Sequence, residues 1–272
     1  MSQFIKMGLV SIIFSLSLLG CQVAQEPNVT KVPLTEEQVT ANVWYQTAGE
    51  AKALYHQGYN IGKMKLDAAL AKGTEKKPAI VLDLDETVID NSPYQAMTIA
   101  EGKSSPYKIK EWFQQAKAEA LPGAVSFLKY ANDKGVEIYY ISNRKQGQLE
   151  ATLQNLRQLG IPQADKEHVL LRKDKNEKGK EGRQKQITLQ HNILLFFGDN
   201  LSDFTGFDNK SVQDRNQTVE EMKDSFGDKF IIFPNPMYGD WEYALYQYDS
   251  QKSDADKSKI RHNALRTFKV NK

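Results

Sequence analysis

The sequence contains 272 residues, of which 40% are hydrophobic and 26% are charged, and its formal net charge at pH 7 is +2. Such a composition is typical of a globular protein and excludes a disordered chain, and the small net charge speaks against a nucleic-acid polymer as the partner. The single cysteine excludes an intramolecular disulfide, and the length suffices for one large domain or for a domain with an elaborated cap.

Residues 1–20 have the layout of a secretory signal peptide. Lys6 precedes the apolar run Met7–Leu19, which is too short and too weakly flanked for a stable membrane span. The run closes with Leu18–Cys21 (LLGC), which resembles the bacterial lipobox, where the cysteine sulfur receives a diacylglyceryl group and the peptide is cut just before it. Because the only cysteine stands at that point, we expect lipidation of Cys21. An ordinary signal peptide with an incidental cysteine is the alternative.

A lipid anchor predicts a place in the cell envelope, with the folded part facing away from the cytoplasm. Burial of an acyl chain contributes about 0.8 kcal/mol per CH₂, so two or three chains hold a protein on a membrane. Gln22 stands where an aspartate would retain the protein in an inner membrane. This suggests the outer membrane in a Gram-negative cell and the plasma membrane in a Gram-positive cell. Residues 21–38, with Pro27 and Pro33 among polar neighbours, predict a flexible tether.

Residues 39–272 are expected to form one domain, and two stretches of it to form a small, mainly helical cap. The first stretch is about 39–75, where Asn42–Ala71 carries apolar residues at three- and four-residue steps, the pattern of one long amphipathic helix. The second stretch is about 90–121, which contains a loop and a helix. We expect it to cover the ends of the central strands.

The apolar run Ala79–Leu82 predicts a short buried strand, and two aspartates follow it directly. Asp83 and Asp85 are one residue apart, so Leu84 between them is expected to point back into the interior, because side chains alternate along an extended chain. A strand that ends in an ordinary polar turn is the alternative, since aspartate is common in turns.

Four further strands are predicted, and two of them run directly into polar residues. Val136–Ile141 runs into a Ser-Asn-Arg sequence, Ile193–Phe197 runs into a segment with two aspartates, and Phe230–Phe233 stops at a proline; His168–Leu171 is a shorter strand. Strands that alternate with helical stretches predict an α/β fold with a Rossmann-like parallel sheet flanked by helices.

In an open parallel sheet the carboxyl ends of the strands lie along one edge, where ligands bind. The polar residues that follow the strands would therefore meet in one cleft with a lysine from residues 178–180; they are Asp83, Asp85, Ser142, Asn143, Asp199 and Asp203. Carboxylates gathered in this way repel one another unless a cation lies between them, and oxygen ligands suit Mg²⁺. The pattern therefore predicts a Mg²⁺ site that also accepts a phosphate group.

Four segments in this order resemble the motifs of the haloacid-dehalogenase superfamily. They are Asp83–Thr87 (DLDET), Ser142–Arg144 (SNR), a lysine before a helix, and Gly198–Asp203 (GDNLSD). More narrowly, the chain resembles the bacterial class C acid phosphatases of the lipoprotein e family, from the lipobox through Pro234–Trp241. The resemblance implies that 39–272 is a haloacid-dehalogenase-like phosphatase domain that hydrolyses phosphomonoesters through an aspartyl-phosphate.

The resemblance also implies roles for single residues. Asp83 would be the nucleophile, and Asp85 the general acid and then the general base, with a pKa raised by the neighbouring carboxylates. Mg²⁺ would be held by the Asp83 carboxylate, the Asp85 carbonyl and Asp199, while Asp203 would orient waters or the lysine. Hydrogen bonds to the phosphoryl oxygens would come from Ser142 and Asn143.

The catalytic, phosphate-binding lysine is expected to be Lys180, because Lys180–Arg183 (KEGR) resembles the family's lysine followed three positions later by arginine; Lys178 is the competitor. Family members often act on nucleoside monophosphates and hold the base between aromatic rings. Tyr238 matches one such ring best, and Trp112 or Tyr107 would be the opposing face. Packing of the cap onto the core is the alternative role of these aromatic residues.

The predicted function is a Mg²⁺-dependent acid phosphatase of broad phosphomonoester range, which includes 5′-nucleotides. One alternative is a narrow 5′-nucleotidase or a phosphotransferase of the same superfamily. The other is a surface lipoprotein that binds a ligand without catalysis. The expected partners are the substrate and the membrane, and a homodimer is possible.

Overall fold

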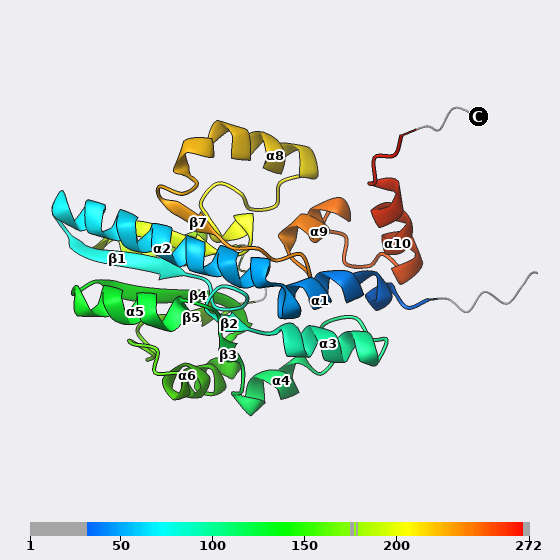
Figure 1. The fold of residues 1–272 in the computed structure, drawn as a ribbon, viewed down its shortest axis with the longest axis horizontal. Coiled ribbons are helices and arrows are strands. Elements are labelled where there is room, and N and C mark those ends of the chain that lie inside the picture. The colour runs from blue at the N-terminus through cyan, green and yellow to red at the C-terminus, as the bar shows by residue number, and fades with distance from the viewer. Residues whose placement is uncertain (1–31, 175–176, 178, 269–272) are drawn as a thin grey trace, which may run out of the picture. The chain divides into compact units, whose positions relative to one another are not determined.

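The structure is a computed structural model that describes residues 32–174, 177 and 179–268. The lipobox with Cys21 and most of the predicted tether lie outside the described residues. Pro33–Lys272 form one compact unit around a five-stranded sheet, in which each neighbouring pair of strands is parallel (Figure 1). The strand order is β5-β4-β1-β6-β7, which confirms the predicted Rossmann-like parallel sheet.

The strands of this sheet fall on the apolar runs of the sequence. They are β1 (Lys77–Leu82), β4 (Glu137–Lys145), β5 (Val169–Arg172), β6 (His191–Gly198) and β7 (Phe230–Ile232). A second sheet consists of two short antiparallel strands, β2 (Ile89–Asp90) and β3 (Glu119–Ala120).

Helices occupy most of the sequence between the strands in the described part of the chain. The α-helices are α1 (Val39–Thr47), α2 (Gly49–Ala71), α3 (Ser92–Ala100), α4 (Ile109–Gln115), α5 (Ala124–Asp133), α6 (Leu149–Gln158), α7 (Glu181–Thr188), α8 (Val212–Glu221), α9 (Asp240–Leu245) and α10 (Asp254–Asn263). Short 3₁₀ helices are η1 (Leu34–Gln38), η2 (Gln146–Gln148), η3 (Leu201–Asp203) and η4 (Lys223–Ser225). Among the described residues, none of these helices combines the length and apolar character that crossing a membrane requires.

The central strand β1 is buried on both of its faces. Ile80 and Leu82 belong to a core cluster with residues of α2, α5 and α6, whereas Ala79 and Val81 belong to a second cluster with Ile187 of α7. Because side chains of a strand alternate between its faces, the uninterrupted apolar run reflects helices on both sides of the sheet.

Helix α2 is one of the layers that cover the sheet, which differs from the expected cap over about 39–75. The Tyr55 ring stacks on Phe233, with 4.9 Å between ring centroids, and the Tyr59 ring lies 5.9 Å from that of Phe197 in β6. The expected single helix is also broken, because Ala48 adopts an extended conformation (φ −75°, ψ 131°) between α1 and α2. The aromatic stripe of this helix therefore packs the core.

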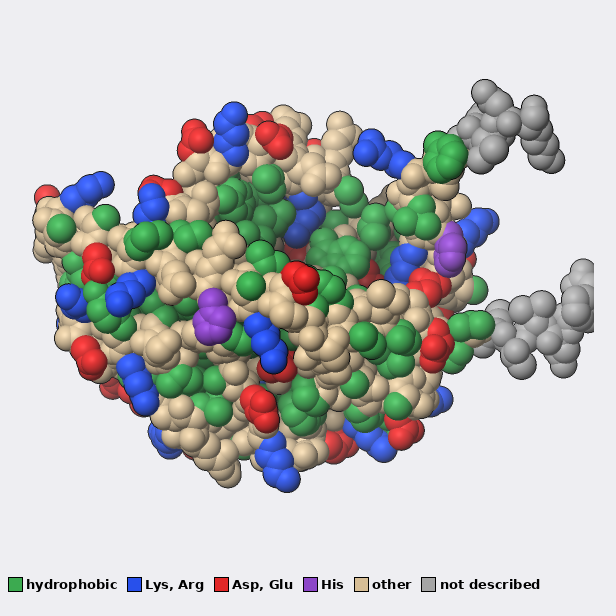
Figure 2. All heavy atoms as spheres, in the orientation of Figure 1, with side chains coloured by type: hydrophobic (Ala, Val, Ile, Leu, Met, Phe, Trp, Pro, Cys, Tyr) green, Lys and Arg blue, Asp and Glu red, His purple; other side chains and the backbone are tan. Residues whose placement is uncertain are grey.

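The stretch 90–121 contains α3, α4 and β3. In Figure 1 these elements and α1 lie beyond the carboxyl end of β1, next to the loop that carries the first aspartates. On the face drawn in Figure 2, lysine and arginine side chains are interspersed with acidic ones. This distribution agrees with the small net charge of the sequence.

The C-terminal helix α10 is fastened to the start of the compact unit. Arg261 donates to Glu37 Oε2 (3.0 Å) and to the Leu34 carbonyl (3.3 Å) in η1, and it also forms an ion pair with Glu242 of α9. Leu34 is buried. The last residues of the predicted tether over 21–38 thus form η1 and belong to the compact unit, because an apolar side chain and an ion pair hold them there.

Candidate active site

A tight turn after β1 presents the first two aspartates. The Asp83 N–H donates to the Phe197 carbonyl of β6 (3.0 Å), which ties Asp83 to the sheet. The carbonyl of Leu84 accepts N–H groups from the three residues that end at Ile89, and its side chain is fully buried, as the sequence predicts. Glu86 in this turn has a positive φ of 58°, a conformation that is uncommon outside glycine.

Three aspartates from two strand ends form a compact group. The carboxylates of Asp83, Asp199 and Asp203 each offer an oxygen atom, and these atoms lie within 4.8 Å of one another. The three residues are buried, and they come from the loop after β1, from the residue after β6 and from η3. The predicted convergence of Asp83 and Asp199 at the carboxyl edge of the sheet is therefore present in the structure.

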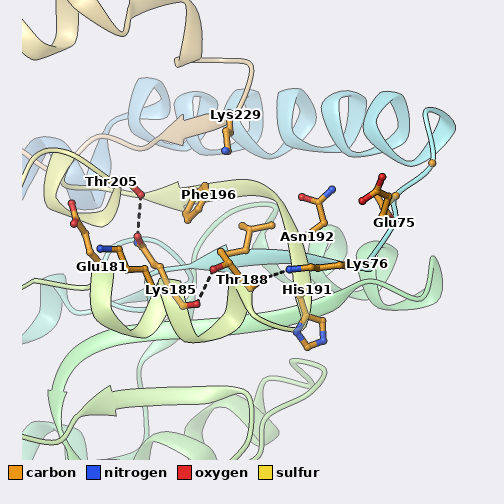
Figure 3. Close-up of a pocket in the computed structure, with 14 residues that line it drawn as sticks. Glu75, Lys76, Glu181, Lys185, Thr188, His191, Asn192, Phe196, Thr205 and Lys229 are labelled. Atoms are coloured by element: carbon orange, nitrogen blue, oxygen red, sulfur yellow. Dashed lines mark hydrogen bonds between the residues drawn. The ribbon is translucent and has the colours of Figure 1, made fainter.

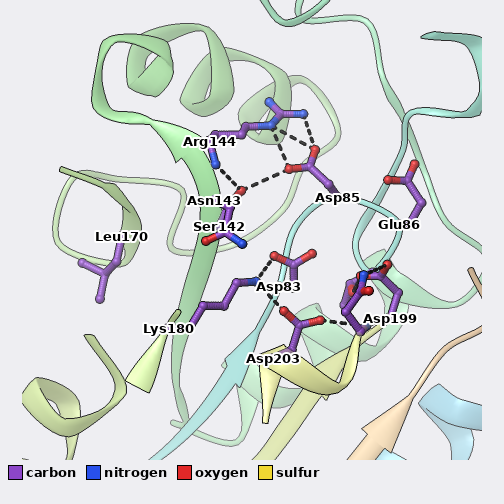
Figure 4. Close-up of polar contacts among 12 residues, drawn as sticks. Asp83, Asp85, Glu86, Ser142, Asn143, Arg144, Leu170, Lys180, Asp199 and Asp203 are labelled. Carbon is purple, nitrogen blue, oxygen red and sulfur yellow. Dashed lines mark hydrogen bonds and ion pairs between the residues drawn. The ribbon is translucent and has the colours of Figure 1, made fainter. Parts of the chain in front are cut away.

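Lys180 reaches into this group from the start of α7. Its ammonium forms an ion pair with Asp203 Oδ1 (2.7 Å) and contacts Asp83 Oδ1, and the residue is only 3% exposed (Figure 4). Asp203 thus contacts the lysine that it is expected to orient. The competitor Lys178 lies outside the described residues.

Arg183 holds the segment that carries Lys180. One of its terminal nitrogens donates to the carbonyls of Ser142 (2.7 Å) and Leu170 (2.8 Å), and the other donates to the Gly179 carbonyl (3.2 Å). These bonds join the residue before Lys180 to the ends of β4 and β5. The lysine-to-arginine spacing noted in the sequence thus has a structural reason.

The charge of this group is not balanced by protein side chains alone. Burial, together with Asp203 and Asp85, raises the pKa of Asp83 to about 7 in spite of Lys180. Burial, together with Asp203 and Asp83, raises the pKa of Asp199. Burial by itself would lower the pKa of Lys180, but Asp203 and Asp83 raise it. Three ionised carboxylates and one ammonium leave two negative charges in a buried place, which is costly without a compensating cation.

The donor set fits a divalent cation. Carboxylate oxygens are the ligands that hard cations such as Mg²⁺ prefer, and such sites commonly use one or two carboxylates together with substrate oxygens. Asp199 is held in place by the amide groups of Asn200 (2.6 Å) and Asn235 (2.8 Å) and by the Thr87 hydroxyl (3.3 Å). Ligands that are oriented by such hydrogen bonds are typical of metal sites.

Asp85 has surroundings of a different kind, and they contradict the expected raised pKa. Arg144 donates to both carboxylate oxygens (2.8–3.2 Å), and Ser142 and Asn91 donate one hydrogen bond each. Burial favours the neutral acid, but the charge and hydrogen bonds of Arg144, with those from Ser142 and Asn91, lower the pKa of Asp85 below its ordinary value. An arginine in contact outweighs the crowding by neighbouring carboxylates.

Sequence reasoning missed three residues that hold this part of the site: Arg144, Asn91 and Glu86. Arg144 had a signal, because it stands two positions after Ser142 on β4 and therefore on the same face of that strand. Its guanidinium also lies 3.8 Å above the ring of Phe113 in α4. Asn91 and Glu86 stand in a polar segment without a spacing that would mark them.

Two of the three aromatic residues named from the sequence, Tyr238 and Trp112, contact this network. The Tyr238 hydroxyl donates to Glu86 Oε2, and Trp112 Nε1 donates to Asn91 Oδ1 (2.8 Å). Tyr107 lies beneath the ammonium of Lys108, which is 5.0 Å from its ring centre. All three are partly buried.

The two residues expected to bind phosphate differ in exposure. The Ser142 hydroxyl is buried and donates to Asp85 Oδ2 (3.1 Å), whereas Asn143 is exposed and accepts a hydrogen bond from Arg183 (3.4 Å).

A cavity of about 670 Å³ lies away from this group (Figure 3). It runs along α7 and β6, and its lining includes Lys76, Thr188, His191 and Asn192 at the amino end of β6. Asp199 follows the opposite, carboxyl end of the same strand. None of the described side chains predicted to bind metal or phosphate lines this cavity.

A comparison with known families finds a match over residues 5–241 to the acid phosphatases of the HAD (haloacid-dehalogenase) superfamily, subfamily IIIB. The chain belongs to this family. The class C acid phosphatase from Bacillus anthracis is 66% identical in sequence, with a TM-score of 0.86, over 88% of this chain and 100% of that one. A second structure of the same enzyme, with tungstate bound, matches equally well.

Membership in the family confirms three of the predictions made from the sequence: the resemblance to class C acid phosphatases, the fold class and the activity. The protein is an acid phosphatase, a hydrolase of phosphoric monoesters, and the acidic cluster lies at the sheet edge where such a fold binds its ligands. The alternative of a non-catalytic surface lipoprotein is thereby set aside.

Proposed function

We propose that this acid phosphatase is Mg²⁺-dependent and works through an aspartyl-phosphate on Asp83. The observation that carries the proposal is the buried group of Asp83, Asp199 and Asp203 with Lys180 between two of its members. Mg²⁺ would be held by the carboxylates of Asp83 and Asp199 and the Asp85 carbonyl. When bound, it would supply the positive charge that lets a phosphate dianion approach a carboxylate.

The chain's own residues account for the bonds that change. An oxygen of Asp83 bonds to phosphorus while the ester P–O bond breaks, and the leaving oxygen takes a proton from Asp85. Water then attacks phosphorus, gives a proton back to Asp85, and releases inorganic phosphate and free Asp83. Asp85 is ionised in the free site, so it must take up its proton as the negative substrate arrives, because a nearby negative charge raises the pKa of a carboxyl group.

The substrates we propose are phosphomonoesters that include 5′-nucleotides. Tyr238 and Trp112 come from distant parts of the sequence and bond to Glu86 and Asn91, which are linked to each other and through Asn91 to Asp85. Tyr107 is a further aromatic residue of the same stretch as Trp112. Stacking of a base on an aromatic ring contributes about 1–3 kcal/mol and tolerates many bases. The tungstate bound to the Bacillus anthracis enzyme is an oxyanion, which supports a site for a phosphoryl group here, with Ser142 and Asn143 as donors.

We also propose that Cys21 is lipidated and holds the enzyme in the cell envelope. The support is the LLGC sequence behind an apolar leader. Removal of residues 1–20 would leave residues 21–32 as the link between the acyl chains and the compact unit.

The test is a comparison of the wild type with Asp83→Asn, because the amide cannot form the acyl phosphate. Activity on p-nitrophenyl phosphate with Mg²⁺ is expected to fall by about 10³-fold or more. Asp228→Asn is the control, because Asp228 pairs with Lys65 on the surface and its side chain is 65% exposed. An Asp83→Asn enzyme that keeps its activity, or a wild type indifferent to EDTA, would disprove the proposal.

Relative rates on AMP, NMN and p-nitrophenyl phosphate distinguish a broad phosphatase from a narrow 5′-nucleotidase. Addition of an alcohol acceptor identifies a phosphotransferase, since the acyl phosphate would then pass to the alcohol instead of to water.

A further inference from the structure

Asn91 lies at the junction of the acid–base carboxylate and the cap, and it is only 3% exposed. Its amide Nδ2 donates to Asp85 Oδ1 (2.8 Å), and its Oδ1 accepts from Trp112 Nε1 (2.8 Å) of α4. Its main-chain N–H donates to Glu86 Oε1 (2.7 Å). Since one neighbour only accepts and the other only donates, the orientation of the amide is determined by its partners.

The hydrogen bonds on Asp85 are distributed unequally between its two oxygens. Oδ1 accepts from Asn91 and twice from Arg144, at 2.8–3.0 Å, whereas Oδ2 accepts from Ser142 and from Arg144 at 3.1–3.2 Å. An oxygen that already accepts three N–H groups has little capacity to hold a proton. Asn91 therefore helps to reserve Oδ2 for the proton that Asp85 exchanges, and a hydroxyl such as that of Ser142 can turn away from it.

Asn91 is connected to both aromatic residues beside the site. Its side-chain amide accepts the indole N–H of Trp112, and its main-chain N–H donates to Glu86, whose other oxygen accepts the Tyr238 hydroxyl. Glu86 is fully buried, and two donors on its carboxylate fix its position. A displacement of either ring is thus transmitted through Asn91 to the orientation of Asp85.

We infer that Asn91 is a positioning residue for the phosphatase reaction, which directs proton transfer to Asp85 Oδ2 and aligns the cap indole with it. The inference rests on the proposed function, in which Asp85 exchanges that proton. The proton moves from Oδ2 to the ester oxygen as the P–O bond breaks, and it returns to Oδ2 from the attacking water.

The test exploits the different need of two substrates for a proton. p-Nitrophenolate leaves readily without protonation, whereas the alkoxide of glycerol phosphate does not. In Asn91→Ala, kcat on glycerol phosphate is expected to fall at least about tenfold more than kcat on p-nitrophenyl phosphate, because general acid catalysis is worth about 10²–10⁴-fold where it is needed. Asn91→Asp keeps an oxygen for Trp112 and removes the donor to Asp85, so it is expected to show the same selective loss and to fold where alanine fails.

Asn155→Ala is the matched control. Asn155 is also only 3% exposed. Its side chain forms two hydrogen bonds with the main chain of Ala118: it donates to the carbonyl (2.9 Å) and accepts from the N–H (3.2 Å). Its loss is expected to lower the melting temperature and to leave the ratio of the two rates unchanged. Equal losses on both substrates in folded Asn91 variants would overturn the inference, whereas an inactive wild type would overturn the proposed function itself.

Discussion

Lys180 has two effects on the candidate site: it pairs with two of the carboxylates, and it supplies positive charge. Its ammonium contacts the carboxylates of Asp83 and Asp203, which belong to the group that would bind a divalent cation. A cation bound as proposed would compete with the lysine for the same carboxylates, although the proposed mechanism uses both to neutralise a phosphate dianion.

Lys180→Met is expected to separate these two effects. Activity on p-nitrophenyl phosphate should fall by about 10²–10³-fold, the usual loss when one charge-stabilising group is removed from a site. Affinity for Mg²⁺, measured by titration calorimetry, should rise, because the carboxylates lose their ammonium partner. A weaker Mg²⁺ affinity in Lys180→Met would contradict the competition inferred from the contacts.

At the scale of residues, the sequence predicted the acids better than the groups that hold them. Asp83, Asp199 and Asp203 follow buried strands, so their convergence is a consequence of strand polarity. Arg144 and Glu86 act through hydrogen bonds to residues distant in sequence, such as Arg144 to Asp85, and Asn91 reaches Asp85 across the turn between them. Such bonds depend on loop geometry and on side-chain direction, which periodicity does not report.

At the scale of elements, α2 lies against the sheet because two of its glycines face aromatic rings of the strands. A Cβ placed on Gly62 would lie 2.6 Å from the ring of Phe197 in β6, which is closer than atoms in contact can approach. Glycine at this position lowers the helix propensity of α2 but allows the helix to pack closely on β6.

Gly62→Ala is expected to destabilise the protein by about 1–3 kcal/mol through overpacking, less the gain in helix propensity of up to about 1 kcal/mol. For a protein of this size, each kcal/mol corresponds to about 2–4 °C in the melting temperature. Gly49→Ala, in the same helix, is the control, since a Cβ there would meet no described atom within 4 Å. A melting temperature that is equal or higher in Gly62→Ala would refute this packing argument.

The elements that the sequence predicted best are those with both faces buried. The runs that became β1, β6 and β7 are continuous and apolar, and their strands appear within a few residues of the expected bounds. The break between α1 and α2 at Ala48 was not predictable, because alanine favours helix and tertiary packing overrides its propensity. The predicted extent of the cap differs from the structure for a related reason. An amphipathic pattern does not indicate which surface the apolar face of a helix packs against.

At the scale of the whole molecule, a cluster of one histidine and two carboxylates lies at the amino end of the sheet, opposite the candidate site. His168 precedes β5 and lies between Glu137, at the amino end of β4, and Asp165; its ring nitrogens are 2.7 and 2.8 Å from their carboxylates. Burial alone would lower the pKa of His168, but the hydrogen bonds to Glu137 and Asp165 raise it above its ordinary value.

The folded protein therefore binds this proton more tightly than the unfolded chain. The resulting stability is fully present below the unfolded pKa of about 6.5, and it is lost as the pH rises through the higher folded pKa. His168→Asn is expected to lower the melting temperature more at about pH 5.5 than at about pH 9. His262→Asn on the exposed side of α10 is the control, and an effect of His168→Asn independent of pH would exclude this charge linkage.

The ion pairs of Arg261 connect α10 to two other parts of the folded enzyme. The charged stretch after residue 250 has the composition of a dispensable tail, yet its helix supplies the cation for Glu242, which is almost buried, and for Glu37 at the beginning of the unit. One guanidinium thus links α10 both to η1 and to α9. A chain that is cut before α10 is therefore expected to leave the carboxylates of Glu37 and Glu242 without this counter-ion, and to be less stable than the full chain.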